Sequence, residues 1–405
     1  MRKVHLFAGL AILFLGTSTA VGQVLFGPCE PTACEPCEQA TCDPCDPVCG
    51  SSGIFGSPFT FGGWVEMGVR TNSHGFNNNG PMNTGSRRRT DVTLSQLYLS
   101  LEKEMDTRRG FDWGARTDLV YGSHAGSMQT YGDETFDYNW GTNRHGYGMS
   151  AYKVYGDLGY KDWSVRIGKF GTPIGWEGSA SKDNFFYSHS YCYWIEPATH
   201  MGVLGTYDAT KNLSISAGWT TGEDSSYANP NNNKAVLTGF TYSLSDDATV
   251  YYWLNAGKAY HDAVDYFIQS VCFEWDLTKR FTYVLQYNLR NDSSEEGNAS
   301  AYGVNNHFLY KLNDQWGVGT RFEWLRNNGG YFANAEGEPF MGDFYQVTLG
   351  LNWNPRSNVS IRPEIRYDWC DGAKPFGPSD TFGGYSSAGE RSYQFSGGCG
   401  VVVTF

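Results

Sequence analysis

The stretch Val-Ser-Ile-Arg-Pro-Glu-Ile-Arg-Tyr-Asp-Trp, residues 359–369, decides the fold class. Its odd-numbered positions are apolar, whereas arginine, glutamate, arginine and aspartate occupy the even-numbered positions 362–368. Residues two apart in a β-strand share a face, so this strand has one apolar side and one charged side. A soluble sandwich would turn the charged side to bulk water, whereas a membrane barrel would turn it to a water-filled lumen. This strand alone leaves both fold classes open.

The spacing of similar stretches separates the two classes. Alternating stretches recur from Phe59 onward, and their connections alternate between short and long. Short connections are expected near 105–109, 161–162, 210–212, 246–247, 278–280, 313–315 and 355–358. Long ones are expected at about 72–89, 122–146, 171–199, 222–234, 257–262, 291–298, 326–341 and 371–392. Short periplasmic turns and long external loops are typical of outer-membrane barrels, and the count predicts an all-β, antiparallel transmembrane barrel of about 16 strands over residues 58–405.

The C-terminal strand supports the same fold. Alternation continues to the last residue, Phe405, and Phe395, Val401 and Val403 share its face. A strand that ends in phenylalanine resembles the signal by which the barrel-assembly machinery recognises outer-membrane barrels. Pairing of this strand with the first one would remove the exposed sheet edge.

Residues 1–22 are predicted to be a signal peptide. Arg2 and Lys3 precede an apolar run over residues 6–15, and small residues follow at 17–20. The apolar run is too short to span a bilayer, so we expect export and a location in the bacterial outer membrane, with its lipid as a partner. The net charge of −12 and the lack of a dominant basic face argue against a nucleic-acid partner.

Residues 23–57 form an acidic leader rich in cysteine and proline, for which no packed core is expected. Six of the chain's ten cysteines lie there: Cys29, Cys34, Cys37, Cys42, Cys45 and Cys49. In zinc sites built from two ligand pairs, the two pairs are normally separated by a dozen or more residues. Here only residues 38–41 separate the two Cys-x-x-Cys pairs. We therefore favour disulfides or cross-links to other envelope proteins over a zinc site, which stays open as the weaker alternative. No metal or other cofactor is predicted.

Several motifs resemble the OmpL-like β-barrel porin family, also called β-barrel porin-2. They are Gly168-Lys169-Phe170 with Pro173, Gly175 and Glu177; residues 186–191; Pro197 with Gly202; residues 114–119 with Tyr121 and Gly122; and residues 362–369. The resemblance covers roughly residues 59–405 and leaves the leader outside. It implies an outer-membrane channel and supplies no catalytic residue. Trimers are common among barrels of this class, so a homotrimer is one expected assembly.

Residues 171–199 form the third external loop by this count. In general porins of this size the third loop folds into the lumen, and by that analogy of architecture we expect the same here. Our hypothesis is that loop and wall charges approach one another and filter solutes by charge and size. The loop residues are Glu177, Lys182, Asp183, His189 and Glu196, and the wall residues are Arg116, Asp118, Arg166, Arg362, Glu364, Arg366 and Asp368. Alternatively, these charges pair with each other and only stabilise the wall.

The function that follows is passive diffusion of ions and small hydrophilic solutes. The alternative is a structural envelope protein that is anchored by the barrel and cross-linked through the leader. An enzyme is not predicted, because adjacent residues such as Ser188 and His189 diverge on an extended chain and no acidic partner orients the histidine. Aromatic residues of the strands could stack on sugars, although girdles at the lipid interface explain them more simply.

Overall fold

The computed structural model describes residues 58–73, 92–131, 136–141, 146–227, 234–258, 264–294, 297–329, 331–332, 340–376 and 391–405. The predicted signal peptide, the leader and its six cysteines lie outside these residues. Among the described residues, no helix has the length and apolar character needed to cross a membrane.

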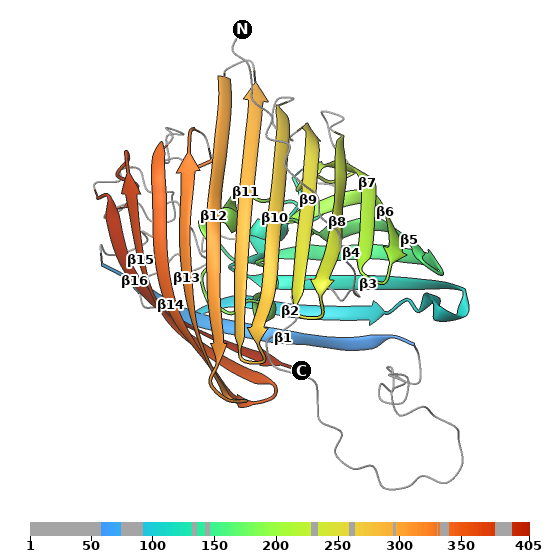
Figure 1. Ribbon diagram of the computed structural model, residues 1–405, viewed down its shortest axis with the longest axis horizontal. Helices are drawn as coiled ribbons and strands as arrows, with labels where there is room; N and C mark the ends of the chain where they lie inside the picture. Colours follow the sequence, from blue (N-terminus) through green and yellow to red (C-terminus); the bar gives the residue numbers. More distant parts are fainter. Residues whose placement is uncertain are drawn as a thin grey trace, which may run out of the picture.

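Sixteen antiparallel strands form one closed barrel (Figure 1), which confirms the predicted fold class. Each strand pairs with its sequence neighbours, and β1 pairs with β16 to close the ring. The strands are β1 (Thr60–Asn72), β2 (Thr93–Lys103), β3 (Phe111–Gly122), β4 (Gly148–Tyr160), β5 (Trp163–Gly171), β6 (Thr199–Thr210), β7 (Leu213–Glu223), β8 (Ala235–Ser245), β9 (Ala248–Lys258), β10 (Asp265–Thr278), β11 (Phe281–Ser294), β12 (Gly297–Lys311), β13 (Trp316–Asn327), β14 (Gly342–Arg356), β15 (Val359–Asp371) and β16 (Tyr393–Thr404).

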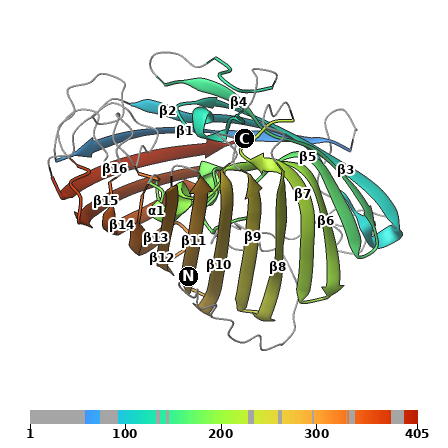
Figure 2. The ribbon, with the colours of Figure 1, turned by 90° about the horizontal axis from the view of Figure 1, so that it is seen from above.

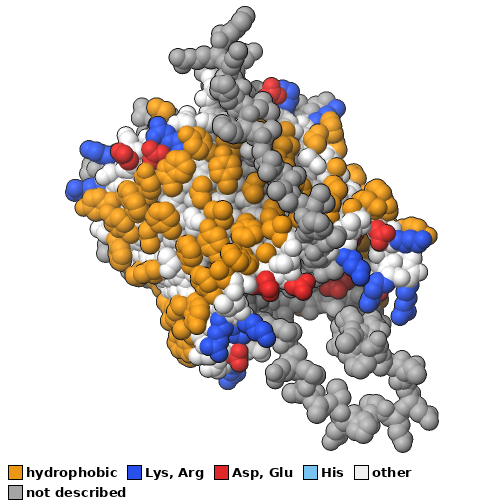
Figure 3. Space-filling model, in the orientation of Figure 1, with side chains coloured by type: hydrophobic (Ala, Val, Ile, Leu, Met, Phe, Trp, Pro, Cys, Tyr) orange, Lys and Arg blue, Asp and Glu red, His pale blue; other side chains and the backbone are white. Residues whose placement is uncertain are grey.

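Alternation along each strand separates a lipid face from a lumen face. In β15, Ile365 and Tyr367 are exposed on the outer surface, whereas Arg362 and Arg366 are buried inside. The outer face in Figure 3 is a broad band of hydrophobic side chains, with charged side chains mainly toward its rims. Lipid offers no hydrogen-bond partners, so a spanning strand places its polar side chains on the inside.

Stacked aromatic pairs mark both ends of the outer band. Trp163 stacks on Tyr207 at the short-turn end, with 4.2 Å between ring centroids. Tyr345 stacks on Trp369 near the long-loop end, with 5.0 Å between centroids. Aromatic girdles of this kind are typical of barrels at the two membrane interfaces.

The connections alternate in length as predicted, with one exception. A long loop was expected over about 291–298, but β11 continues to Ser294 and β12 begins at Gly297. The ladder extends to the pairs Ser293–Asn298 and Ser294–Gly297, so this expectation was wrong. The polar side chains of this stretch predicted a loop. Strand pairing is made by backbone groups, so polar residues can continue the ladder once the strand has left the apolar layer of the membrane.

Strand β5 is only nine residues long and pairs with β4 no further than Lys169. Residues 125–131 and 136–141 lie near the C-terminal end of β5 and connect to the strands around it. The backbone N–H of Met149 in β4 donates to the Trp140 carbonyl at 2.8 Å, and Tyr131 forms a β-bridge with Ser225, which follows β7. The Lys169 ammonium reaches the same segment, 2.6 Å from the Asp137 carboxylate, and both side chains are fully buried. Because β5 ends after nine residues, the chain that follows it leaves the wall early.

Candidate functional site: the inward segment

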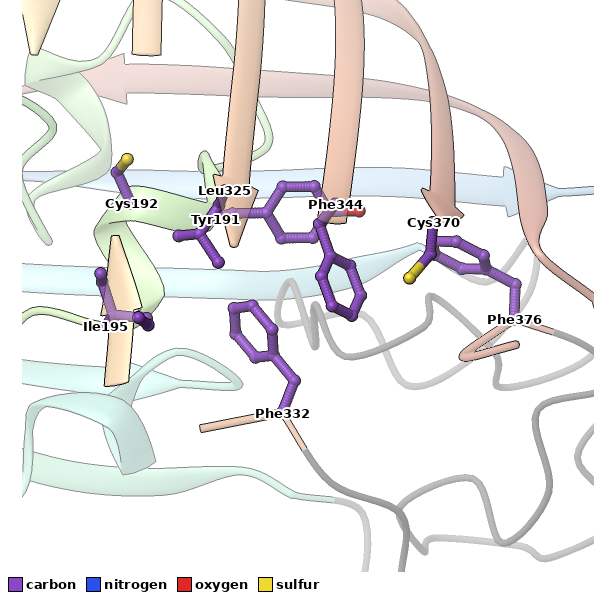
Figure 4. Close-up of a cluster of buried hydrophobic side chains, with 9 residues drawn as sticks. Tyr191, Cys192, Ile195, Leu325, Phe332, Phe344, Cys370 and Phe376 are labelled. Carbon is purple, nitrogen blue, oxygen red and sulfur yellow. The ribbon is translucent and has the colours of Figure 1, made fainter. Parts of the chain in front are cut away.

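Residues 172–198 connect β5 to β6 and lie inside the barrel; we call them the inward segment. They contain the short 3-10 helix η5 (Ser181–Asp183) and the helix α1 (Tyr191–Trp194). Figure 2 shows α1 within the ring of strands. Around α1, Tyr191 and Cys192 pack into a buried apolar cluster with Phe344 of β14 (Figure 4), the Tyr191 and Phe344 ring centroids being 5.4 Å apart.

Three consecutive aromatic side chains of the inward segment, Phe185 to Tyr187, sit against glycines of the wall. A Cβ atom on Gly350 would lie 2.8 Å from the Phe186 ring, and one on Gly400 would lie 2.5 Å from the Tyr187 ring. Gly68 of β1 makes room for the Tyr187 hydroxyl in the same way. The glycines therefore form sockets on the inner wall, and any larger side chain there would force the aromatic rings to move.

Arg321 of β13 is the central anchor of the segment. Its guanidinium pairs with the Glu177 carboxylate at 2.5 Å and donates to the Ser188 carbonyl at 2.6 Å and the His189 carbonyl at 3.1 Å. The Arg321 side chain is completely buried. Hydrogen bonds that involve a charged partner are about twice as strong as neutral ones, so this contact fixes the loop backbone firmly.

Two arginines of β15 hold other parts of the segment. Arg362 donates to the Ser181 carbonyl at 2.6 Å and the Asn184 carbonyl at 2.7 Å, and it pairs with Glu66 of β1. Arg366 donates to the His189 carbonyl at 2.6 Å. In both cases a wall guanidinium bonds to loop backbone, so the bond does not depend on which side chain the loop carries.

Carboxylates of the wall accept hydrogen bonds from the loop amides. Glu323 accepts from the backbone N–H groups of Tyr191 and Cys192 at 2.7 and 2.6 Å. Glu364 accepts from those of Tyr187 and Ser188 at 3.0 and 3.1 Å. The wall thus supplies both hydrogen-bond donors and acceptors to the loop backbone. Without them these backbone groups would have no partner, because burial removes them from water.

Burial and neighbouring charges set the ionisation of two loop side chains. Burial alone would raise the pKa of Glu177, but the positive charge of Arg321 and the nearby histidines hold it at about 2. Burial lowers the pKa of His189 to about 3, although Glu177 lies 3.9 Å away. At neutral pH the carboxylate is therefore charged and the imidazole, which stacks on Tyr193, is neutral.

The structure brings only some of the sequence-predicted site residues together. Those within the network of the inward segment are Glu177, His189, Arg362, Glu364, Arg366 and Asp368, the last accepting from the Tyr191 hydroxyl at 2.8 Å. Glu196 accepts instead from the uncharged amides of Gln286 and Asn288, at 2.5 Å each.

The other predicted residues pair locally. Arg166 pairs with Asp157 of the neighbouring strand at 2.9 Å, and Lys182 pairs with Asp183 at 2.5 Å. Arg116 pairs with Asp118 at 2.9 Å and with Glu102 at 2.7 Å. None of these pairs crosses the barrel.

Two anchors, Arg321 and Glu323, were not among the predicted site residues. The sequence did carry a signal for them, because both lie on the polar side of an alternating stretch over residues 316–324. That is the same pattern as in residues 359–369, from which the β15 residues were predicted. A search for charged residues on the lumen side of every strand would have found them.

A cavity of 1320 Å³ lies beneath the inward segment, on the short-turn side of the barrel. Lys182 and Phe185 of the inward segment line it, as do Arg116 of the wall and residues 355–358, which run from the end of β14 into the turn that follows. Arg116 and Lys182 keep part of their side chains exposed, at 22% and 37%, unlike the anchoring arginines.

Residues 58–405 match the model of the family described as "Putative beta-barrel porin-2, OmpL-like". The chain belongs to this family. The match covers all sixteen strands, and family and fold together place this β-barrel porin in the outer membrane and indicate a channel rather than an enzyme. No curated protein matches the chain.

Solved structures of other outer-membrane proteins and porins share the fold of this porin at low sequence identity. In-vitro folded OmpT of Vibrio cholerae, in its trimer form, has a TM-score of 0.57 and 12% identity, covering 86% of this chain and 99% of its own. An anion-selective porin from Comamonas acidovorans has a TM-score of 0.56 with the same identity and coverage. The channel DcaP of Acinetobacter baumannii has a TM-score of 0.55 and 8% identity, covering 86% and 97%.

Within the described part of the porin, no group of three or more histidine, cysteine, aspartate or glutamate residues is arranged to hold a metal ion. The four cysteines described there, Cys192, Cys272, Cys370 and Cys399, are free.

Proposed function

We propose that this porin lets ions and small hydrophilic solutes diffuse passively through a lumen that the inward segment narrows. The observation that carries the proposal is the docking of residues 172–198 across the barrel, onto β13, β14 and β15. A segment held by buried arginines and glycine sockets is a fixed constriction rather than a swinging lid. Its position inside a closed barrel suits size selection.

Charge selection would then depend on the partly exposed charges. Arg362 and Arg366 bond to loop backbone and are almost fully buried, so their charges have little influence on an ion in the lumen. Arg116, Lys182 and Asp183 line the cavity and retain contact with water. We propose that these three contribute most to ion selectivity, through the local charge that a solute meets on the short-turn side.

Single-channel conductance of the refolded full-length barrel in a planar bilayer tests the function. Discrete, stable steps are expected, and the reversal potential in a salt gradient reports the selectivity. A barrel that shows the gel mobility of the folded state but no steps at any voltage would contradict passive diffusion.

The alternative, a structural protein cross-linked through the leader, stays a prediction, because its six cysteines lie outside the described residues. High-mass species in unreduced envelopes that collapse on reduction would support it. Assembly as a homotrimer is likewise a proposal, which gel mobility without heating can test. OmpT, one of the similar structures, is described in a trimer form.

A further inference from the structure

The cavity beneath the inward segment has the features of a binding site and not only of a water-filled passage. It measures 1320 Å³, while pockets that hold small ligands are commonly about 300–1,000 Å³. The inward segment forms its roof with Trp176, Asn184 and Phe185, and the opposite end lies at the turn after β14. It can therefore hold a small solute together with water.

The charges around the cavity balance. Four basic and four acidic side chains are among the described residues that line it: Arg116, Lys182, Lys311, Arg356, Glu102, Asp183, Glu274 and Asp314. Most are already matched, with Arg116 2.7 Å from Glu102, Lys182 2.5 Å from Asp183 and Lys311 3.1 Å from Asp314. The lining as a whole therefore carries no excess charge of either sign and gives a charged solute no overall advantage, although single partly exposed side chains still set the local charge that an ion meets.

Two asparagines on the inner face of β14 carry side-chain atoms that have no hydrogen-bond partner among the described residues. Asn352, which is 5% exposed, has an unbonded Oδ1 atom, and Asn354, two residues further on, has an unbonded Nδ2 atom. Both residues line the cavity. Buried polar atoms are almost always hydrogen-bonded, so we expect this acceptor and this donor to bond to water or to a solute in the cavity.

A hydroxyl group is the ligand chemistry that fits both atoms, because it donates and accepts at once. Side chains two apart on a strand are about 7 Å apart, so neighbouring hydroxyls of one solute could reach both. A monatomic ion can satisfy only a donor or only an acceptor. The pair therefore favours a neutral solute with several hydroxyl groups.

The roof adds an aromatic surface. The Trp176 indole N–H donates to Glu274 at 3.3 Å, which fixes the plane of the ring at the cavity. Trp64 also lines the cavity, but Tyr98 covers it at 3.7 Å between ring centroids and the Lys182 ammonium lies 5.4 Å from its ring. Trp176 is partly exposed, with the His307 ring 4.5 Å away between centroids, whereas Trp64 is only 2% exposed, so Trp176 is the better platform for the apolar C–H face of a sugar ring.

We propose that this cavity binds neutral saccharides, with Asn352 and Asn354 bonding to their hydroxyls and Trp176 packing against a ring. The proposal deepens the proposed function, since it names the solute class of the same lumen. The cavity is then a low-affinity binding site on the diffusion path, where a neutral sugar stays bound longer than a salt ion.

Isothermal titration of the detergent-folded full-length barrel with sucrose, and separately with gluconate, tests the proposal without requiring conductance. Sucrose is expected to bind, and gluconate, an open-chain sugar acid, is expected to bind at least about fivefold more weakly, because the already paired charges of the lining offer its carboxylate no partner in exchange for water. Asn352→Leu and Asn354→Leu should each weaken sucrose binding roughly five- to tenfold, because each removes a hydrogen bond without changing the side-chain size greatly.

Gln346→Leu is the matched control. It lies on the same inward face of β14 and has an unbonded Nε2 atom, but it does not line the cavity. Sucrose binding should be unchanged in this variant. If Asn352→Leu fails to fold, the less buried Asn354→Leu variant carries the test.

Equal loss of sucrose binding in all three variants, equal binding of gluconate, or no binding to the unaltered barrel would each overturn the proposal. Conductance separates this outcome from the proposed function. Steps without sugar binding would refute the saccharide site and leave the diffusion channel standing. Sugar binding without steps would refute the channel and leave the site.

Discussion

The lumen has two regions that use the same residue types in different ways. Above the cavity, Arg321, Arg362 and Arg366 are buried and bond to loop backbone. Around the cavity, Arg116 and Lys182 keep exposed surface and pair with nearby carboxylates. The difference teaches that a lumen-facing charge does not by itself form a filter, because its role depends on whether the inward segment covers it.

Arg321→Ala should have the largest effect on the buried region above the cavity. It leaves the Glu177 carboxylate buried without its partner, and loss of one member of a buried pair costs about 3–5 kcal/mol. We expect a lower melting temperature, measured by heat-dependent gel mobility, and a larger single-channel conductance because the inward segment is released.

Arg326→Ala is the control for that variant. Arg326 lies on the same strand, but its pair with Asp343 is partly exposed, at 2.7 Å, and such pairs contribute roughly 0–1 kcal/mol. Equal destabilisation by the two variants would mean that Arg321 is not a special anchor.

Gly400→Ala tests the socket beneath Tyr187 and has the next largest expected effect. The added methyl would lie 2.5 Å from the Tyr187 ring, and overpacking of this kind costs about 1–3 kcal/mol. Gly397→Ala on the same strand meets its nearest atom only at 3.7 Å and should change stability by less than about 0.5 kcal/mol. Melting temperatures of the two variants decide the point, and a larger loss in Gly397→Ala would contradict the socket.

Acid should loosen the buried region through His189. Its pKa is about 3 in the folded barrel and 6.5 when unfolded, so the unfolded chain binds the extra proton between those values. Stability from the neutral imidazole is therefore present above pH 6.5 and is lost as the pH falls toward 3. The unaltered barrel should lose about 3 kcal/mol more between pH 7 and pH 4 than His189→Phe, whose ring keeps the stack on Tyr193. Parallel melting curves would contradict this assignment.

The sequence predicted the barrel and the side of the wall on which each charge lies, because alternation follows directly from strand geometry. It could not predict which charges are hydrated. Arg116 and Arg362 occupy equivalent positions in their alternating stretches, yet only Arg362 is covered by the inward segment. That covering depends on sockets at Gly68, Gly350 and Gly400, which are far apart in the chain and come together only when the barrel closes.

Lys182→Glu should change selectivity with almost no effect on stability, which makes it the finest test of the comparison. Its pair with Asp183 is partly exposed, so we expect less than about 0.5 kcal/mol of change. The reversal potential in a salt gradient should shift toward cations, because a positive side chain of the cavity becomes negative. Lys211→Glu, in the exposed turn between β6 and β7, makes the same charge change outside the cavity and should shift the reversal potential less.

Arg362→Glu should instead destabilise the barrel, since it would place a carboxylate against the Ser181 and Asn184 carbonyls. A selectivity shift in a stable Arg362→Glu barrel, with none in Lys182→Glu, would reverse the roles of the two regions.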